Sequence, residues 1–164
     1  MKVIICGKGG SGKSTITALL ARHYASEGRR VLVVDTDMSN VGLHRILGTG
    51  APPDLTGHFG GKGGRRRDNP QMPHPSQLPG QAPVRRSGPP PPPAPGTWTY
   101  DKIPEGYSAE KDGIKLVSIG KITDAYQFGK GYWTGMARRF LGGLALEGSD
   151  IALIDAEAGV EHLD

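Results

Sequence analysis

Residues 7–15 are Gly7-Lys8-Gly9-Gly10-Ser11-Gly12-Lys13-Ser14-Thr15, and they are the strongest indication of the fold class of the chain. It matches the pattern G-x-x-x-x-G-K-[ST], whose glycines let the backbone curl until successive N–H groups point inward at an anion. Between a strand and a helix, such a pattern indicates a loop that holds the phosphates of a nucleotide. The residues expected to contact the phosphates are Gly7, Gly9, Gly10, Ser11, Gly12, Lys13, Ser14 and Thr15.

Two side chains at the end of this loop supply charge and metal ligation. Lys13 places a positive charge beside the β- and γ-phosphates, and the Ser14 hydroxyl is a ligand for Mg²⁺. The helix expected to begin near Lys13 adds the positive end of its dipole. The pattern therefore predicts that ATP and Mg²⁺ bind here, with Lys13 also acting as a catalytic residue.

The segments around the loop have the apolar patterning of an α/β protein. Residues 2–6 form a short apolar run that predicts a strand buried on both faces, and residues 31–34, 114–119 and 151–154 predict further strands. Residues 13–27 have helical periodicity, and residues 136–146 can form a second helix. The side chains of the first helix expected to pack on the sheet are Ile16, Leu19, Leu20 and Tyr24. This order predicts a P-loop NTPase fold: a doubly wound, mostly parallel sheet with helices on both faces.

Aspartates follow two of the predicted strands. Because the carboxyl ends of parallel strands face the ligand crevice, Asp155 is expected to hold Mg²⁺ through water. Asp37 is expected to orient the attacking water as a catalytic residue, with Asp35 behind it or beside a water of the ion. The alternative for this pair is a turn in which an aspartate caps a helix. Gly159 is suited to a backbone N–H that approaches the γ-phosphate.

Lys8 lies inside the loop, one residue after Gly7, where an ordinary phosphate loop needs no lysine. Its side chain cannot easily curl back onto its own nucleotide. One use is to reach a nucleotide held by a second subunit, where a cation that stabilises the transition state contributes on the order of 10³–10⁵ in rate. The other is a solvated lysine that raises the local potential. Residue type alone does not choose between them.

The composition changes sharply in the middle of the chain. Residues 50–99 are rich in proline, glycine and arginine, include the unbroken run Pro89–Pro93, and show no sustained period. Such a segment cannot bury enough apolar surface to offset its ordering entropy. We therefore expect three parts: residues 1–49 as the first half of the domain, residues 50–99 as a disordered insert, and residues 100–164 as the continuation of the domain.

Charge and cysteine content narrow the classes of function. The formal net charge is +4, but residues 50–99 carry this excess, so nucleic-acid binding by the domain is not favoured. The single cysteine, Cys6, excludes an internal disulfide and a cysteine-rich metal site within one chain. The sequence has no apolar run of membrane-spanning length and no signal peptide, so a cytoplasmic protein is expected.

The loop resembles the deviant Walker A motif of the MinD/ParA/nitrogenase iron protein class, in which Lys8 matches the additional lysine. This resemblance implies a homodimer that forms on ATP binding, with Lys8 crossing the interface. Further segments resemble the CooC-type ATPases, which assist nickel insertion into carbon monoxide dehydrogenase. These segments are residues 103–105, 110–116, 119–122 and 155–163, of which Glu157-Ala-Gly-x-Glu-His162 is the most specific.

The sequence departs from the CooC pattern in two places. Where that family has a Cys-x-Cys pair, residues 131–136 contain no cysteine, so no transition-metal ligand is carried over. The chain also ends shortly after Gly159, so the P-loop domain is expected to be incomplete at its C-terminus. Three functions stay open: an ATP hydrolase that assists a client metalloenzyme, a MinD/ParA-like positioning or partitioning switch, and a truncated nucleotide-binding module without turnover.

Overall fold

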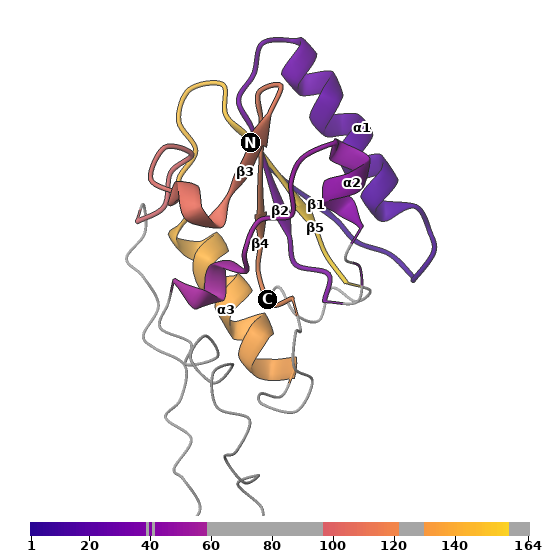
Figure 1. Cartoon of the computed structure of the whole chain (residues 1–164), viewed down its shortest axis with the longest axis vertical. Helices are drawn as coiled ribbons and strands as arrows, with labels where there is room; N and C mark the ends of the chain where they lie inside the picture. Colours follow the sequence, from indigo (N-terminus) through magenta and orange to yellow (C-terminus); the bar gives the residue numbers. More distant parts are fainter. Residues whose placement is uncertain (39, 41, 59–96, 122–129, 158–164) are drawn as a thin grey trace, which may run out of the picture.

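The computed structural model describes residues 1–38, 40, 42–58, 97–121 and 130–157 (Figure 1). Within these ranges the chain forms five strands, three α-helices and two short 3-10 helices, Leu55–Gly57 and Glu105–Tyr107. The strands are β1 (Lys2–Ile5), β2 (Val31–Asp35), β3 (Ala109–Lys111), β4 (Ile114–Ser118) and β5 (Ile151–Asp155). The α-helices are α1 (Lys13–Ser26), α2 (Leu43–Leu47) and α3 (Lys130–Gly143).

The strands form one sheet in the order β1-β5-β2-β4-β3. Every neighbouring pair is parallel except β3 and β4, which are antiparallel. The turn between β3 and β4 contains Asp112 and Gly113, both at positive φ, as a tight hairpin requires. The expected α/β architecture with a mostly parallel sheet is therefore confirmed, with one antiparallel strand at the edge.

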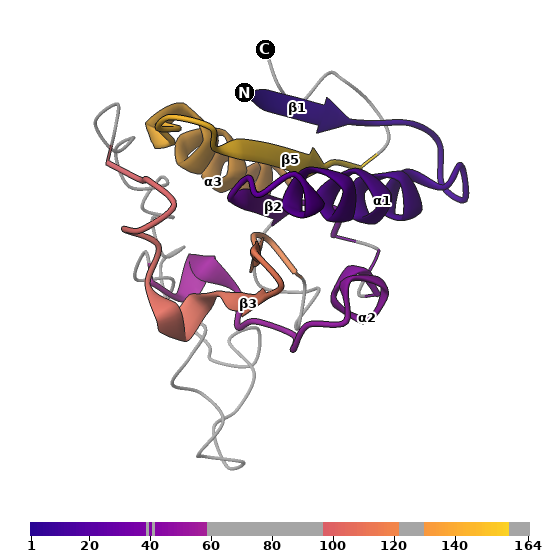
Figure 2. The same cartoon turned by 90° about the horizontal axis from the view of Figure 1, so that it is seen from above.

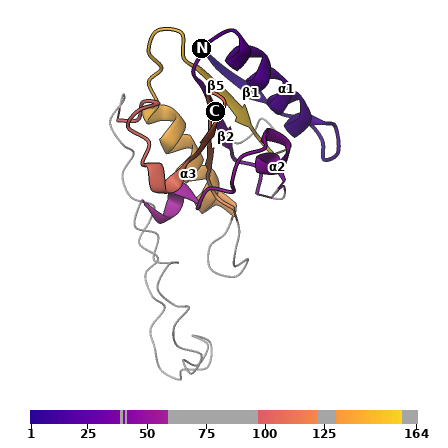
Figure 3. The same cartoon turned by 45° about the horizontal axis from the view of Figure 1, so that its top comes forward.

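Helices cover both faces of the sheet, as Figures 1 and 3 show: α3 lies on one side, and α1 with α2 on the other. The alternation along β2 divides the core accordingly. Leu32 and Val34 pack with Phe140 of α3, whereas Val31 and Val33 pack in a second cluster with residues of α1 and α2. All five residues of β2 are buried, because a strand covered on both faces has no polar side.

β1 is less buried than the sequence predicts. The expectation of a strand buried on both faces is wrong for residues 2–5, whose side chains alternate between exposed and half-buried. The reason is its place in the sheet: among the described strands, β1 pairs with β5 alone and forms an edge (Figure 2). Val3 and Ile5 pack against the α1 side of the core, while Ile4 is 46% exposed.

The packing face of α1 also differs from the prediction. Ile16 and Leu19 are 49% and 60% exposed, so their assignment to the sheet side is wrong. Leu20 and Tyr24 are partly buried, and the residues fully against the sheet are small ones, chiefly Thr17, Ala18 and Ala21. The helix begins directly at the loop, so the direction of Lys13 and Ser14 sets which face turns inward. Small side chains on that face let the helix lie close to the sheet.

The limits of the predicted insert are too wide at both ends. Residues 54–58 belong to the domain: Asp54 bridges to Ser118 at the end of β4, and Leu55 is fully buried in the α3 cluster. Trp98 and Thr99 are buried as well. Backbone pairing and buried side chains hold both stretches to the domain. The average composition of residues 50–99 does not reveal these few anchored residues. The stretch 59–96 lies outside the described residues, so the remainder of the insert stays a prediction.

Candidate functional site

The glycine-rich stretch forms a loop between β1 and α1, at the carboxyl end of the strands. Gly10 and Gly12 have φ of 75° and 84°, left-handed values that favour glycine. Gly12 is the N-cap residue of α1, and no side chain caps the helix there. The first amides of α1 therefore remain available to an anion, together with the positive end of the helix dipole.

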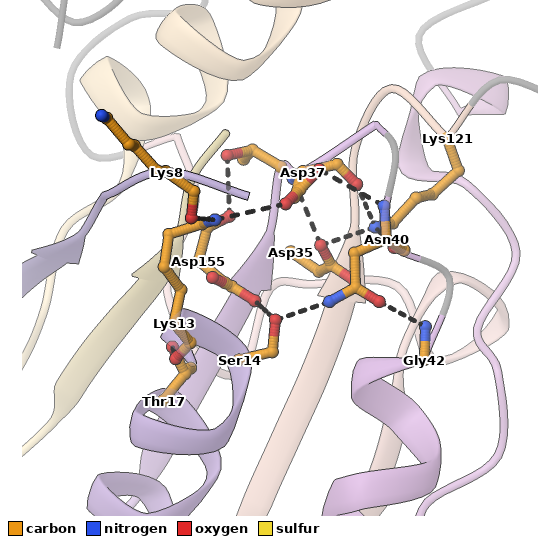
Figure 4. Close-up of polar contacts among 11 residues, drawn as sticks. Lys8, Lys13, Ser14, Thr17, Asp35, Asp37, Asn40, Gly42, Lys121 and Asp155 are labelled. Carbon is orange, nitrogen blue, oxygen red and sulfur yellow. Dashed lines mark hydrogen bonds and ion pairs between the residues drawn. The ribbon is translucent and has the colours of Figure 1, made fainter. Parts of the chain in front are cut away.

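The side chain of Lys13 is held over this loop by the loop's backbone. Its Nζ donates a hydrogen bond to the carbonyl oxygen of Lys8 at 3.2 Å and lies 4.0 Å from Oδ2 of Asp37 (Figure 4). Lys13 is only 8% exposed. A nearly buried ammonium beside open helix amides forms a site for polyanionic ligands.

Ser14 links the loop to β5. Its hydroxyl donates to Oδ2 of Asp155 at 2.6 Å and accepts from Nδ2 of Asn40, also at 2.6 Å. The two residues that the sequence assigns to Mg²⁺ are thus in direct contact, although 141 positions separate them. A hydroxyl oxygen has two lone pairs, so one lone pair of Ser14 remains for a cation.

Asp155 tests whether this site fits a divalent cation. The residue is fully buried, and its Oδ1 has no hydrogen-bond partner within the described part of the chain. Burial raises the pKa of the Asp155 carboxyl, while the hydrogen bond from Ser14 opposes the shift. A buried carboxylate oxygen without a partner, next to an oriented hydroxyl, is the oxygen-donor set that Mg²⁺ and its waters use. The residues present therefore fit the ion.

Asp35 belongs to a neighbouring cluster. Its Oδ1 accepts a hydrogen bond from Nζ of Lys121 at 2.6 Å, and the same ammonium donates to the carbonyl oxygens of Asp37 and Asn40. Burial raises the pKa of Asp35 to about 6, although the nearby Lys121 opposes the shift. Asp35 is thus the partner of a lysine that the sequence analysis did not single out.

The segment after β2 has features of both predicted alternatives for the aspartates. The backbone N–H of Asn40 donates to Oδ1 of Asp37 at 3.3 Å, and that of Asp37 donates to Oδ1 of Asp35 at the same distance, as in a turn. At the same time Asp37 is buried and its Oδ2 faces Lys13. Asp37 therefore both accepts a hydrogen bond within the turn and lies beside Lys13 at the site. Its proposed orientation of the attacking water stays a prediction.

Lys8 differs from the other charged residues of the site. It is exposed, and Figure 4 shows its ammonium pointing away from the cluster, while its carbonyl oxygen faces Lys13. Of the remaining predicted residues, Gly7, Gly9, Gly10, Ser11, Gly12 and Thr15 lie in or next to the loop, whereas Gly159 lies outside the described residues.

Sequence reasoning missed Asn40 and Lys121. Asn40 follows β2 in a short polar stretch and matches no motif. Lys121 lies within residues 119–122, one of the segments that resemble the CooC-type ATPases, but that resemblance implies no role for it. Their significance depends on contacts with residues 26 and 86 positions away, Ser14 and Asp35. The one signal in the sequence was a lysine just beyond an apolar strand, at the same edge of the sheet as the loop.

Comparison with known families agrees with this geometry. Residues 2–130 match the model of the CobQ/CobB/MinD/ParA nucleotide-binding domain, which is most of the chain. The chain belongs to this family. A nucleotide-binding domain agrees with the glycine-rich loop, the oriented Ser14 and the buried Asp155 that meet at one edge of the parallel sheet.

Individual relatives extend the comparison. An uncharacterised ATP-binding protein of Methanocaldococcus jannaschii is 39% identical over 99% of this chain and 60% of its own length. The carbon monoxide dehydrogenase accessory protein CooC of Rhodospirillum rubrum is 31% identical over 99% of this chain and 56% of its own length. An iron-sulfur cluster carrier protein of Rickettsia bellii is 40% identical over 34% of this chain. The chain therefore spans less than two thirds of the length of these relatives.

Neither a similar solved structure nor, in the described ranges, a membrane-spanning helix was found. No solved structure gave a significant match. Among the residues that the structure describes, no helix combines the length and apolarity needed to cross a membrane.

Proposed function

We propose that this member of the CobQ/CobB/MinD/ParA family binds ATP with Mg²⁺ and hydrolyses it as a homodimer. The observation that carries the proposal is the contact of Ser14 with Asp155, whose second oxygen is buried and has no hydrogen-bond partner in the described chain. The relative in Methanocaldococcus jannaschii, described as an ATP-binding protein, supports the choice of nucleotide. Cytoplasm is the proposed location.

In this proposal the chain's own residues bind and orient the reactants. The loop amides and Lys13 hold the β- and γ-phosphates, and Ser14 with Asp155 would hold the ion and its waters. When bound, Mg²⁺ neutralises charge that develops on the phosphate oxygens. Asp37 orients a water for attack on the γ-phosphorus; the bond to the β,γ-bridging oxygen breaks, and ADP and inorganic phosphate leave. Lys8 reaches the phosphates of the partner subunit.

The exposure of Lys8 supports a role across an interface, because its ammonium points away from its own loop. The test is ATP hydrolysis as a function of protein concentration for wild type, Lys8→Ala, Asp37→Ala and the control Lys102→Ala, another exposed lysine. Specific activity should rise with concentration in wild type and Lys102→Ala, and fall at least tenfold in the other two. Equal, negligible rates in all four would remove the hydrolase claim.

The biological role proposed first is maturation of a metallocentre, with nickel and a client such as carbon monoxide dehydrogenase. Its support is the similarity to CooC along almost the whole chain. The similarity of 34% of the chain to an iron-sulfur cluster carrier protein agrees with a role in metal-centre assembly. Equilibrium dialysis of the nucleotide-bound protein against Ni²⁺ tests it; one ion bound per dimer is expected.

A second candidate is a MinD/ParA-like switch for positioning or partitioning. The presence of a single cysteine, Cys6, favours it, because the chain lacks a pair of neighbouring thiolates for a soft metal. Absence of Ni²⁺ binding together with ATP-dependent dimerisation would support this candidate. Nucleotide binding with neither dimerisation nor turnover would indicate a binding module alone.

A further inference from the structure

Lys121 occupies a cage of oxygen atoms beside the nucleotide site. Its ammonium has three hydrogens and three acceptors: Oδ1 of Asp35 and the carbonyl oxygens of Asp37 and Asn40. The side chain of Lys121 is 15% exposed and that of Asp35 is 4% exposed. Hydrogen bonds in which the donor or the acceptor is charged are stronger than hydrogen bonds between neutral groups. The cage therefore ties the segment after β2 to the end of β4.

The position of Lys121 is itself determined by Asp54. The backbone N–H of Lys121 donates to Oδ2 of Asp54, whose Oδ1 accepts from the backbone and the hydroxyl of Thr56. Asp54 also forms a parallel bridge with Ser118, the last residue of β4. Lys121 is thus anchored at its backbone and reaches across to the site with its side chain.

Asn40 carries the effect of this anchor to the metal-binding residues. Its carbonyl oxygen lies in the Lys121 cage, and its side-chain Nδ2 donates to the Ser14 hydroxyl. Its Oδ1 accepts from the N–H of Gly42 at 2.9 Å, which leaves Nδ2 directed at Ser14 (Figure 4). The Ser14 hydroxyl then donates its hydrogen to Asp155, while its oxygen accepts from Asn40 and keeps one lone pair for a cation.

We propose that Lys121 is a positioning residue for the Mg²⁺ part of the site: by holding Asn40 in place, it orients the Ser14 hydroxyl before the ion binds. The inference rests on the proposed function, because it concerns the same ligand. Groups that orient metal ligands change metal affinity by about 10–100-fold when they are removed. The hydrogen bonds of Lys121 within the described chain go to Asp54, Asp35, Asp37 and Asn40 and not to residues 7–15, so its removal should affect nucleotide binding mainly when the ion is present.

The test compares affinity for ADP in Mg²⁺ and in EDTA, by titration of a fluorescent ADP analogue, for wild type, Lys121→Met, Asn40→Ala and Lys115→Met. Lys115 is the matched control: it is on β4, buried, and donates to the carbonyl oxygen of Tyr100 away from the site. The gain in affinity on adding Mg²⁺ should fall about tenfold in Lys121→Met and Asn40→Ala. It should be unchanged in Lys115→Met, and the four affinities in EDTA should agree within about twofold. An unchanged gain in Lys121→Met would overturn the inference and leave the proposed function intact.

A second measurement does not depend on ligand binding. In the nucleotide-free proteins, amide hydrogen exchange of a peptide covering residues 36–42 should be at least several-fold faster in Lys121→Met than in wild type and Lys115→Met. Equal exchange in all three would refute the positioning role. If wild type bound no ADP, the proposed function would fail, and this measurement would still decide whether Lys121 holds the segment.

Discussion

The Ser14 hydroxyl donates a hydrogen bond to Oδ2 of Asp155 at 2.6 Å, joining the start of α1 to the end of β5. The two residues are 141 positions apart in sequence, and both are buried. The other carboxylate oxygen of Asp155 has no hydrogen-bond partner in the described chain. The Ser14 hydroxyl therefore supplies the hydrogen bond that offsets part of the cost of burying this carboxylate.

Removing that hydroxyl should therefore lower stability even without ligand. Ser14→Ala leaves a second buried carboxylate oxygen without a partner, which costs about 1–3 kcal/mol. In a Ser14→Ala/Asp155→Ala double variant the carboxylate is absent, so the combined loss should be smaller than the sum of the two single losses. Urea unfolding of the nucleotide-free wild type, the two single variants and the double variant gives the four unfolding free energies of this double-mutant cycle. Additive losses would show that the hydrogen bond does not stabilise the fold.

Asp35 predicts a specific dependence of stability on pH. Its pKa is raised from 3.8 to about 6 in the folded protein, chiefly by burial. The folded state therefore holds this proton more tightly, and the contribution of Asp35 to stability is full below about pH 4 and lost as pH rises through 6. The change is on the order of 3 kcal/mol. The unfolding free energy of wild type minus that of Asp35→Asn should fall by this amount between pH 4 and 7.5; a difference independent of pH would contradict the shift.

Replacing Lys121 should change the pKa of Asp35 and therefore the pH range over which stability falls. The Lys121 ammonium lowers the pKa of Asp35 against the effect of burial, so Lys121→Met should raise that pKa above 6. The pH-dependent fall in stability then extends to higher pH, and Lys121→Met should lose more stability at pH 8 than at pH 5. Asp35→Asn in the Lys121→Met background should abolish the difference. Urea unfolding at several pH values gives all of these quantities.

The packing of α1 and its hydrophobic periodicity predict opposite effects of substitution at Leu19 and Ala21. Leu19 is largely exposed, so Leu19→Ala should change the unfolding free energy by about 0.5 kcal/mol or less. Ala21 is fully buried against the sheet, so Ala21→Leu should cost about 1–3 kcal/mol through overpacking. Thermal unfolding of both variants checks the assignment. A larger loss in Leu19→Ala than in Ala21→Leu would place the contact face where periodicity alone predicts it.

The amino-acid sequence alone was enough to predict the class of fold and two residues at the centre of the candidate site. The glycine pattern of residues 7–15, the apolar strands and the aspartate after residues 151–154 were enough to predict a parallel α/β domain with Ser14 and Asp155 at one edge. These predictions succeed because they depend on local geometry: a glycine-rich turn before a helix, and the common direction of parallel strands.

The side chains that support Ser14 and Asp155 became apparent from the packing of distant segments. Asn40 and Lys121 meet Ser14 and Asp35 because β2 and β4 lie side by side, an order that no local pattern specifies. The exposure of Ile4 and Leu19 also depends on strand order and on the direction in which the loop starts α1. Contacts between distant segments depend on the packing of the whole domain, and hydrophobic periodicity marks a face as apolar without identifying its neighbour.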